Sequence, residues 1–157
     1  MPIKNAIEKL ATQGKKHGLP KVIKIDKKLS KRWGTGTCVI PDPKEVDALM
    51  KDVPKGKLTT INDIRVKLAQ KHKATISCPI TTGIFASISA HAAEEMRNSG
   101  KKQITPYWRT LKVGGEINPK YPGGVSYQRK ILEKEGHKVK ERGSRVFVLD
   151  YETKLVK

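Results

Sequence analysis

Apolar residues repeat at helical spacing just before Pro54. The side chains on the apolar face of this predicted helix are Val46, Leu49, Met50 and Val53. Asp42 is a residue type favoured at a helix N-cap, Pro43 suits the first helical position, and Glu45 completes the spacing of a capping box. The pattern therefore predicts a short helix that begins after Asp42 and ends before Pro54.

Two further helices follow from the same periodicity. Thr60 is expected to cap the second helix, whose apolar line is Ile61, Ile64 and Leu68. The third helix is expected to start at a threonine cap, Thr81 or Thr82, and to stop at Gly100; its apolar line is Phe85, Ile88, Ala92 and Met96. Small residues on its other faces would let this helix approach a DNA groove closely, although small residues also serve ordinary helix packing.

The remaining C-terminal part has the composition of turns, one helix and one strand. Residues 108–124 predict a hairpin or wing, residues 125–136 a helix, and residues 145–151 a closing strand. Three helices followed by a wing is the order of a winged helix-turn-helix. We therefore expect a mainly α fold with a small β wing over residues 41–157, preceded by a basic N-terminal extension at residues 1–40.

Charge changes this picture by suggesting a partner. The chain has 33 Lys and Arg against 15 Asp and Glu, which gives a formal net charge of +18. Such a field attracts a polyanion, because each neutralised phosphate releases condensed counterions. Nucleic acid is the expected partner class; a ribosome-associated or merely soluble basic protein is the alternative. Within the extension, Gly14, Gly18 and Pro20 interrupt any long helix, so we expect an arm or a loosely packed segment.

Composition argues against several other classes. No apolar run approaches the length of a membrane span, and the N-terminus lacks the apolar stretch of a secretion signal, so we expect a cytoplasmic protein without membrane contact. Cys38 and Cys78 are too few for a disulfide framework or a four-ligand zinc site. We expect two reduced thiols, no metal and no cofactor.

Two segments resemble a known family. The line VPKGKLTTINDI at residues 53–64 resembles the opening of the DNA-binding domain of the 6-O-alkylguanine-DNA alkyltransferases. The line ITPYWRTLKVGGEINPKYPGGVSYQRKILEKEG at residues 104–136 resembles the stretch of that family from its Pro-Cys-His-Arg motif to a helix that ends in Glu-Gly. The resemblance covers about residues 53–136 and implies the winged helix-turn-helix of the alkyltransferase C-terminal domain.

The departures from the family pattern bear on catalysis. Tyr107 and Trp108 stand between Pro106 and Arg109, where the family has its acceptor cysteine and the following histidine. Alkyl transfer needs a thiolate activated by a base, and a phenol beside an indole supplies neither group. Glu135 matches the family's glutamate but lacks these partners. The chain is thus similar to the cysteine-less alkyltransferase-like branch, which binds alkylated guanine without repairing it and passes the lesion to excision repair.

The resemblance implies a pocket for an extruded base. Its expected residues are Pro106, Tyr107, Trp108, Tyr121, Gly123 and Gly124. Aromatic faces there would stack on a base, or the two rings at positions 107 and 108 would simply fill the space of the missing active site. Ile61 stands where the family has a phosphate-rotating tyrosine, and no arginine occurs between Arg65 and Arg97 to replace an extruded base in the stack.

The expected DNA contacts lie at helix starts and on the wing. They are Thr59, Thr60, Thr81, Thr82, Arg109, Lys112 and Lys120. The threonines also have the alternative role of ordinary helix caps. We expect a non-catalytic monomer that binds double-stranded DNA, alkylated or not, and works with repair proteins. The alternatives are an architectural or regulatory binder without lesion specificity, and an enzyme that uses Cys78 as a relocated nucleophile.

Overall fold

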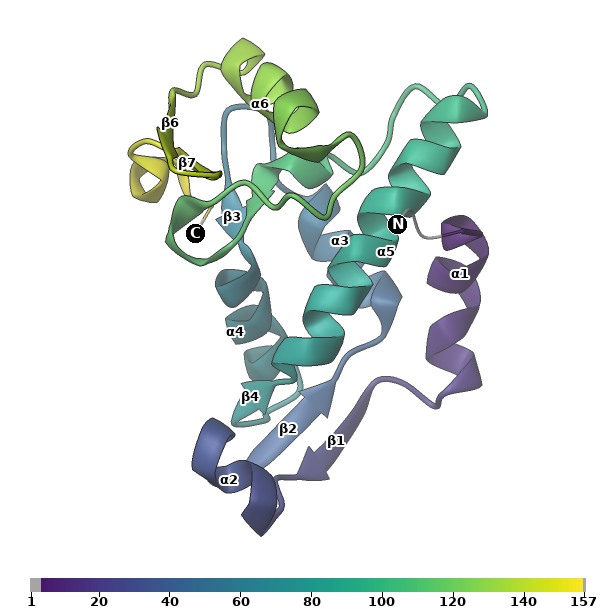
Figure 1. The fold of residues 1–157 in the computed structure, drawn as a ribbon. Helices are drawn as coiled ribbons and strands as arrows, with labels where there is room; N and C mark the ends of the chain where they lie inside the picture. Colours follow the sequence, from purple (N-terminus) through teal and green to yellow (C-terminus); the bar gives the residue numbers. More distant parts are fainter. Residues whose placement is uncertain (1–3, 157) are drawn as a thin grey trace.

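A computed structural model describes residues 4–156, which are mostly helical with three small sheets (Figure 1). The helices are α1 (Ala6–Lys16), α2 (Lys27–Trp33), α3 (Pro43–Lys51), α4 (Ile61–Lys71), α5 (Pro79–Asn98) and α6 (Gly124–Lys134). The strands are β1 (Lys21–Lys24), β2 (Thr37–Ile40), β3 (Thr59–Thr60), β4 (Ile76–Ser77), β5 (Thr110–Leu111), β6 (Val139–Arg142) and β7 (Arg145–Val148). No helix among these is long and apolar enough to cross a membrane.

The sheets are short and join distant parts of the chain. In the three-stranded sheet, β2 pairs antiparallel with β1 and parallel with β4, where Cys38 lies opposite Ile76. A two-residue parallel pairing joins β3 to β5, and β6 and β7 form an antiparallel hairpin. The first sheet therefore ties the N-terminal residues to the segment that leads into α5.

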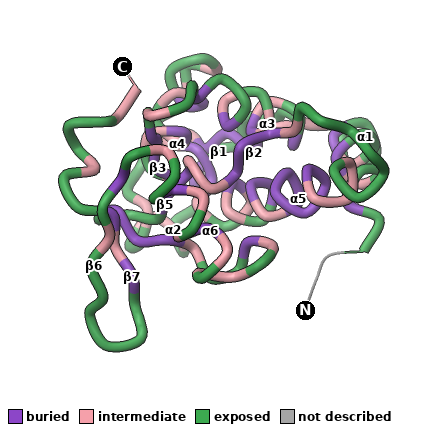
Figure 2. The backbone as a smooth tube through the Cα atoms, turned by 90° about the horizontal axis from the view of Figure 1, so that it is seen from above, coloured by how far each residue is buried: buried purple, intermediate pink, exposed green. Residues whose placement is uncertain are grey.

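Helix α5 lies at the centre of the molecule. It packs against α1 on one side and α3 on the other, and Figure 2 shows buried residues along most of its length. The core around it includes Val46, Met50, Ile64 and Leu68, which are all at most 1% exposed. The apolar faces that the sequence assigns to α3 and α4 are thus the faces that cover α5.

The predicted starts of α3 and α4 are confirmed at atomic detail. The Asp42 carboxylate accepts a hydrogen bond from the Lys44 N–H at 2.9 Å, and the Glu45 carboxylate accepts one from the Asp42 N–H at 3.0 Å. The Thr60 hydroxyl accepts from the Asp63 N–H at 3.1 Å. These contacts satisfy backbone donors that lack a partner in the first turn of a helix, which is why both helices begin there.

The expected threonine cap of α5 is wrong. The helix starts at Pro79, whose fixed φ and missing N–H suit a first helical position, and Cys78 is the N-cap residue. Thr82 lies inside the first turns, where its hydroxyl donates to the Cys78 carbonyl at 2.6 Å. The expected end is right, because Gly100 has φ +95° and the Lys101 N–H donates to the Met96 carbonyl at 3.0 Å.

The segment predicted as a hairpin or wing has a different form. After β5, it makes a tight turn in which the Lys112 N–H donates to the Glu116 carbonyl at 2.8 Å, and then a loop that leads to α6. The antiparallel hairpin of this region comes later, from β6 and β7, and Glu116 forms a bridge to Phe147 on β7. The predicted helix at 125–136 and closing strand at 145–151 match α6 and β7.

Residues 4–40 form elements that the sequence did not predict. Ala6 at the start of α1 is fully buried, and its N–H donates to Glu95 Oε2 on α5 at 2.7 Å. Strand β1 joins the sheet through β2, and α2 follows it. The arm is therefore packed on the rest of the chain, while the division of the chain after residue 40 stays a prediction.

Candidate nucleic-acid interface

The first turns of α5 and the loop before α6 enclose two adjoining hollows. The first is about 430 Å³ and is lined by Ile80, Gly83, Ile84, Ser87, Lys112, Asn118 and Lys120. The second is about 410 Å³ and adds Ile61 of α4, Leu111 of β5 and Tyr121. Gly83, Lys112 and Asn118 line both, so the two form one surface, the α5 hollow.

Two large aliphatic side chains are exposed in the α5 hollow. Ile80 and Ile84 are 57% and 50% exposed and lie one helical turn apart. Gly83 lies between them, and a Cβ added there would meet nothing within 4 Å. This part of α5 is therefore an open apolar strip, of the kind that soluble proteins keep for a binding partner.

Two lysines line the same hollow as the apolar strip. Lys112 and Lys120 come from the loop between β5 and α6, as the sequence analysis expected for DNA contacts, and both are exposed. Glu116 is buried beside them, where Arg145 donates to it at 2.8 Å and the Lys112 ammonium lies 3.7 Å away. The hydrogen bond from Arg145 lowers the pKa of the Glu116 carboxyl despite its burial. The Glu116 carboxylate thus faces two cations, and the net charge of these three side chains is positive.

Of the four threonines expected at phosphates, Thr60 and Thr82 use their hydroxyls inside the protein. Thr59 and Thr60 are buried in β3, and the Thr60 hydroxyl caps α4. Thr82 is fully buried and bonds to Cys78 and to the Ser77 hydroxyl, 2.9 Å away. Thr81 Oγ1 is buried and has no hydrogen-bond partner within residues 4–156. Capping is therefore observed at Thr60, and phosphate contact stays a prediction for all four.

Tyr107 fills the interior behind the α5 hollow. Its side chain is fully buried, with its ring edge-to-face against Trp108 and Tyr121 at centroid distances of 5.3 and 5.9 Å. Its hydroxyl lies 3.2 Å from Glu94 Oε2 and 3.3 Å from the Pro122 carbonyl, and donates to these acceptors. Burial raises the pKa of the phenol far above its usual range, so Tyr107 is a neutral packing residue.

The Glu135 carboxylate accepts hydrogen bonds from three N–H donors of Arg109 and Trp108. Arg109 donates to both carboxylate oxygens, at 2.9 and 2.7 Å, and the Trp108 indole N–H donates at 3.1 Å. The remaining guanidinium nitrogen donates to the Val53 carbonyl at 2.8 Å. Neither an indole nor a guanidinium gives up its proton near neutral pH. Glu135, Arg109 and Trp108 together therefore cannot relay protons. The Arg109 side chain is 13% exposed and makes its contacts inside the protein.

The residues expected to form a base pocket lie close together but face different ways. Tyr121 lines the α5 hollow, whereas Pro106 and Trp108 line a separate hollow of about 480 Å³ beside Lys101 and Lys102. Tyr107 lies buried between them. Gly123 and Gly124 start α6 with positive φ, and a side chain at Gly123 would strike the Tyr127 ring. Their base contacts stay a prediction.

The apolar part of the interface, Ile80 and Ile84, was not predicted from the sequence. Ile80 and Ile84 stand off the buried line of α5, which includes Phe85 and Ile88. Isoleucine at two positions four residues apart, outside the core stripe, is a signal that the pattern contains and that points to an exposed apolar face. Within residues 4–156, no group of three His, Cys, Asp or Glu side chains is placed to hold a metal ion.

A solved protein–DNA complex contains a chain of similar fold. The chain shares its fold with S. pombe Atl1. That protein was crystallised in complex with damaged DNA containing O6-carboxymethylguanine; the TM-score is 0.50 at 18% sequence identity, over 73% of this chain and 94% of that one. A crystal structure of S. pombe ATL in complex with DNA has a TM-score of 0.47 at 17% identity, over the same shares of the two chains. No protein-family model and no curated protein matches the chain.

Proposed function

We propose that this chain is a non-catalytic protein that binds double-stranded DNA across the α5 hollow. The observation that carries the proposal is the hollow itself, which combines an exposed aliphatic strip on α5 with Lys112 and Lys120, in a chain of net charge +18. Lysines neutralise phosphates, and the aliphatic strip contacts sugars and base edges between them. The fold shared with Atl1, a protein crystallised on damaged DNA, supports this choice of partner.

The absence of catalysis follows from the residues at the matching position. Tyr107 is a buried neutral phenol, and Trp108 offers only an N–H donor to Glu135. The Glu94 carboxylate lies within hydrogen-bond reach of the Tyr107 hydroxyl, but burial keeps this phenol neutral, and an indole is not a nucleophile. Cys78 is buried at the N-cap of α5. We therefore propose binding without alkyl transfer.

A damaged base is the proposed ligand of the part of the hollow beside Tyr121. Ile61, Leu111 and Tyr121 supply apolar surface there, Glu116, Asn118 and Arg145 supply polar groups, and its volume of about 410 Å³ accommodates a nucleobase with a small alkyl group. An alkyl group on guanine O6 alters the hydrogen-bonding pattern of the pairing edge and adds apolar surface. The apolar side chains of the hollow favour that added surface. We propose 6-O-alkylguanine as the class of lesion.

A second candidate function is duplex binding without lesion preference. Tyr107 favours it, because the buried ring occupies the interior that an extruded base would otherwise enter. In that case the α5 hollow contacts the groove of an intact duplex, and every duplex binds alike. Phosphate contacts alone carry no information about the base.

Titration of two duplexes distinguishes these functions. Fluorescently labelled duplexes of one sequence, with guanine or 6-O-methylguanine at the centre, are titrated with the full chain at two salt concentrations. The proposal expects binding that weakens steeply with salt and is at least about tenfold tighter for the methylated duplex. Equal affinity for both duplexes leaves the second candidate, and no binding to either would contradict both.

A further inference from the structure

We propose that a second basic surface, on β1 and α2, contacts the DNA duplex beyond the α5 hollow. This surface, the α2 patch, consists of Lys21, Lys24, Lys27, Lys28, Lys31 and Arg32, which are all exposed. The inference rests on the proposed function, because it extends the same interface to the phosphates of the flanking duplex. It names a part of the chain that lies outside the segment resembling alkyltransferases.

The cations of the α2 patch make no ion pair among the residues that the structure describes. The acidic residue within it, Asp26, uses its carboxylate to cap α2, where the Leu29 N–H donates to it at 2.8 Å. The ion pairs found within residues 4–156 all use other cations. Arg129, for comparison, lies 2.7 Å from Glu141 and 3.6 Å from Glu133. The six cations of the patch repel one another, and a polyanion relieves that repulsion.

Packing places the α2 patch at the N-terminal end of α5. Leu29 and Trp33, on the inner side of α2, pack with Ile25 against Cys38 and Cys78. Cys78 is the residue directly before α5, and Ile80 of the α5 hollow follows two positions later. Figure 1 shows α2 beyond β4 at this end of α5. The patch and the hollow therefore adjoin the same end of one helix.

The α2 patch is held in place before DNA arrives. Strand β1 is hydrogen-bonded to β2 along its full length, and the cluster around Ile25 anchors α2 to that sheet. Lysines on ordered elements lose less conformational entropy on binding than lysines on a flexible arm. The patch is thus suited to a rigid duplex that continues past α5, where it would contact phosphates.

The test compares two fourfold variants of the full chain that remove the same charge. The first carries Lys27→Gln, Lys28→Gln, Lys31→Gln and Arg32→Gln, all in α2. The matched control carries Lys130→Gln, Lys134→Gln, Lys138→Gln and Lys140→Gln, which are exposed positions on and after α6. All eight side chains are exposed, so both variants should fold, and circular dichroism checks this.

The readout is the slope of the logarithm of affinity against the logarithm of salt concentration, on a long undamaged duplex. Removal of one lysine or arginine that neutralises a phosphate makes this slope shallower by about 0.9. The α2 variant should make it shallower by roughly 2 to 4 and the control by less than about 1. The ratio of affinities for methylated and unmethylated duplexes should stay the same in both. Equal slopes for the two variants would overturn the inference.

Failure of the inference and failure of the proposed function look different. If the unmodified chain binds no duplex, the proposed function fails and the α2 patch fails with it. If the chain binds DNA and the two variants share one slope, the α5 hollow stands and the patch is not an interface. A variant with Lys31→Gln alone repeats the comparison against Lys134→Gln, so that a folding defect in either fourfold variant leaves the question answerable.

Discussion

At the level of single residues, the proposed absence of alkyl transfer rests on the pair Tyr107 and Trp108. Both aromatic rings are fixed by hydrogen bonds from their polar ends, one toward Glu94 and the other to Glu135. In the resembled family these two positions hold a thiol and its base. The sequence predicted the loss of both groups, but not that the replacements would satisfy the carboxylates left around them. That outcome depends on distances that only the folded chain shows.

Restoring the thiol alone should therefore not restore transfer. We expect Tyr107→Cys to carry no label after a single turnover with radiolabelled 6-O-alkylguanine DNA. Trp108 provides no base for the new thiol, and burial disfavours the thiolate. The unmodified chain serves as the control for Cys78 and should also stay unlabelled. Label on either protein would show that another group in the chain activates a nucleophile.

Among the elements, α3 and α4 were predictable from their capping residues. Helix α1 and the starting residue of α5 were not predicted. Gly14 suggested an interrupted helix, yet it lies buried in α1 against the side chain of Asp42. A glycine required by a neighbouring helix looks the same in sequence as a glycine that breaks one. Likewise Thr81 and Thr82 looked like caps, although the preceding Pro79 is what starts α5.

Two glycine-to-alanine substitutions distinguish a glycine that packing requires from a glycine in open space. Alanine normally stabilises a helix by about 0.5–1 kcal/mol relative to glycine. Gly14→Ala should instead lower the free energy of unfolding by roughly 1–3 kcal/mol, because the new Cβ overlaps the Asp42 carboxylate. Gly83→Ala, in open space on α5, should raise it. Urea denaturation measures both, and a stabilised Gly14→Ala would contradict the observed packing of α1.

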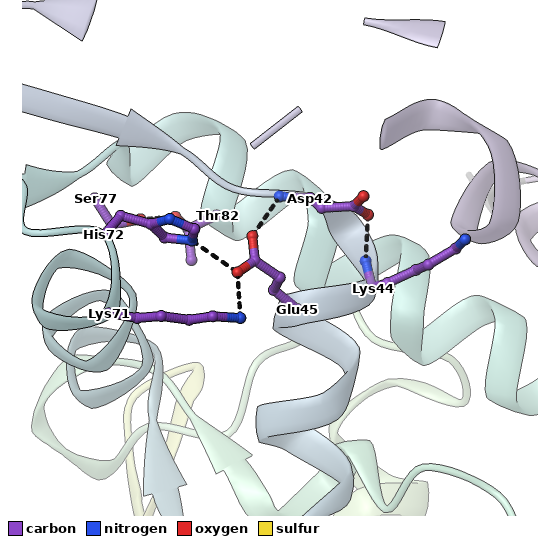
Figure 3. Close-up of polar contacts among 7 residues, drawn as sticks. All are labelled: Asp42, Lys44, Glu45, Lys71, His72, Ser77 and Thr82. Atoms are coloured by element: carbon purple, nitrogen blue, oxygen red, sulfur yellow. Dashed lines mark hydrogen bonds and ion pairs between the residues drawn. The ribbon is translucent and has the colours of Figure 1, made fainter. Parts of the chain in front are cut away.

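A polar contact between α3 and the end of α4 centres on one carboxylate. Glu45 lies between His72 Nε2 at 2.7 Å, Lys71 Nζ at 2.6 Å and the Asp42 N–H (Figure 3). Burial alone would raise the pKa of Glu45, but the hydrogen bonds from Lys71, Asp42 and His72 outweigh it and lower the pKa below the usual 4.5. The carboxylate form is thus favoured by folding.

This network predicts a loss of stability in acid. Because the pKa of Glu45 is lower in the folded chain, its contribution is complete above about pH 4.5 and is lost as the pH falls through the folded value. Glu45→Gln should cost roughly 1–3 kcal/mol at pH 7 and lose less stability on acidification than the unmodified chain does. Urea denaturation at about pH 7 and about pH 3.5 measures the difference. An unchanged acid profile would assign the sensitivity to other carboxylates.

For the whole molecule, the proposed partner rests on the net charge of +18 and on the α5 hollow. The charge was evident from composition, and the order of helices from periodicity. What the sequence did not indicate was where apolar and basic surface meet, because Ile80, Ile84 and Lys120 come together only through the packing of α5 against the loop before α6. The proposed interface is thus a property of the folded molecule.

Substitutions at Gly83 test whether duplex DNA binds across the α5 hollow. A side chain there enters open space, so neither Gly83→Glu nor its control Gly83→Ala should disturb the fold. The measurement is the dissociation constant of each variant for a duplex that contains 6-O-methylguanine, at one salt concentration. We expect Gly83→Glu to bind this duplex at least about tenfold more weakly than the unmodified chain, because its carboxylate faces the phosphates. Gly83→Ala should bind nearly as well as the unmodified chain. Unchanged affinity in Gly83→Glu would contradict binding across the α5 hollow.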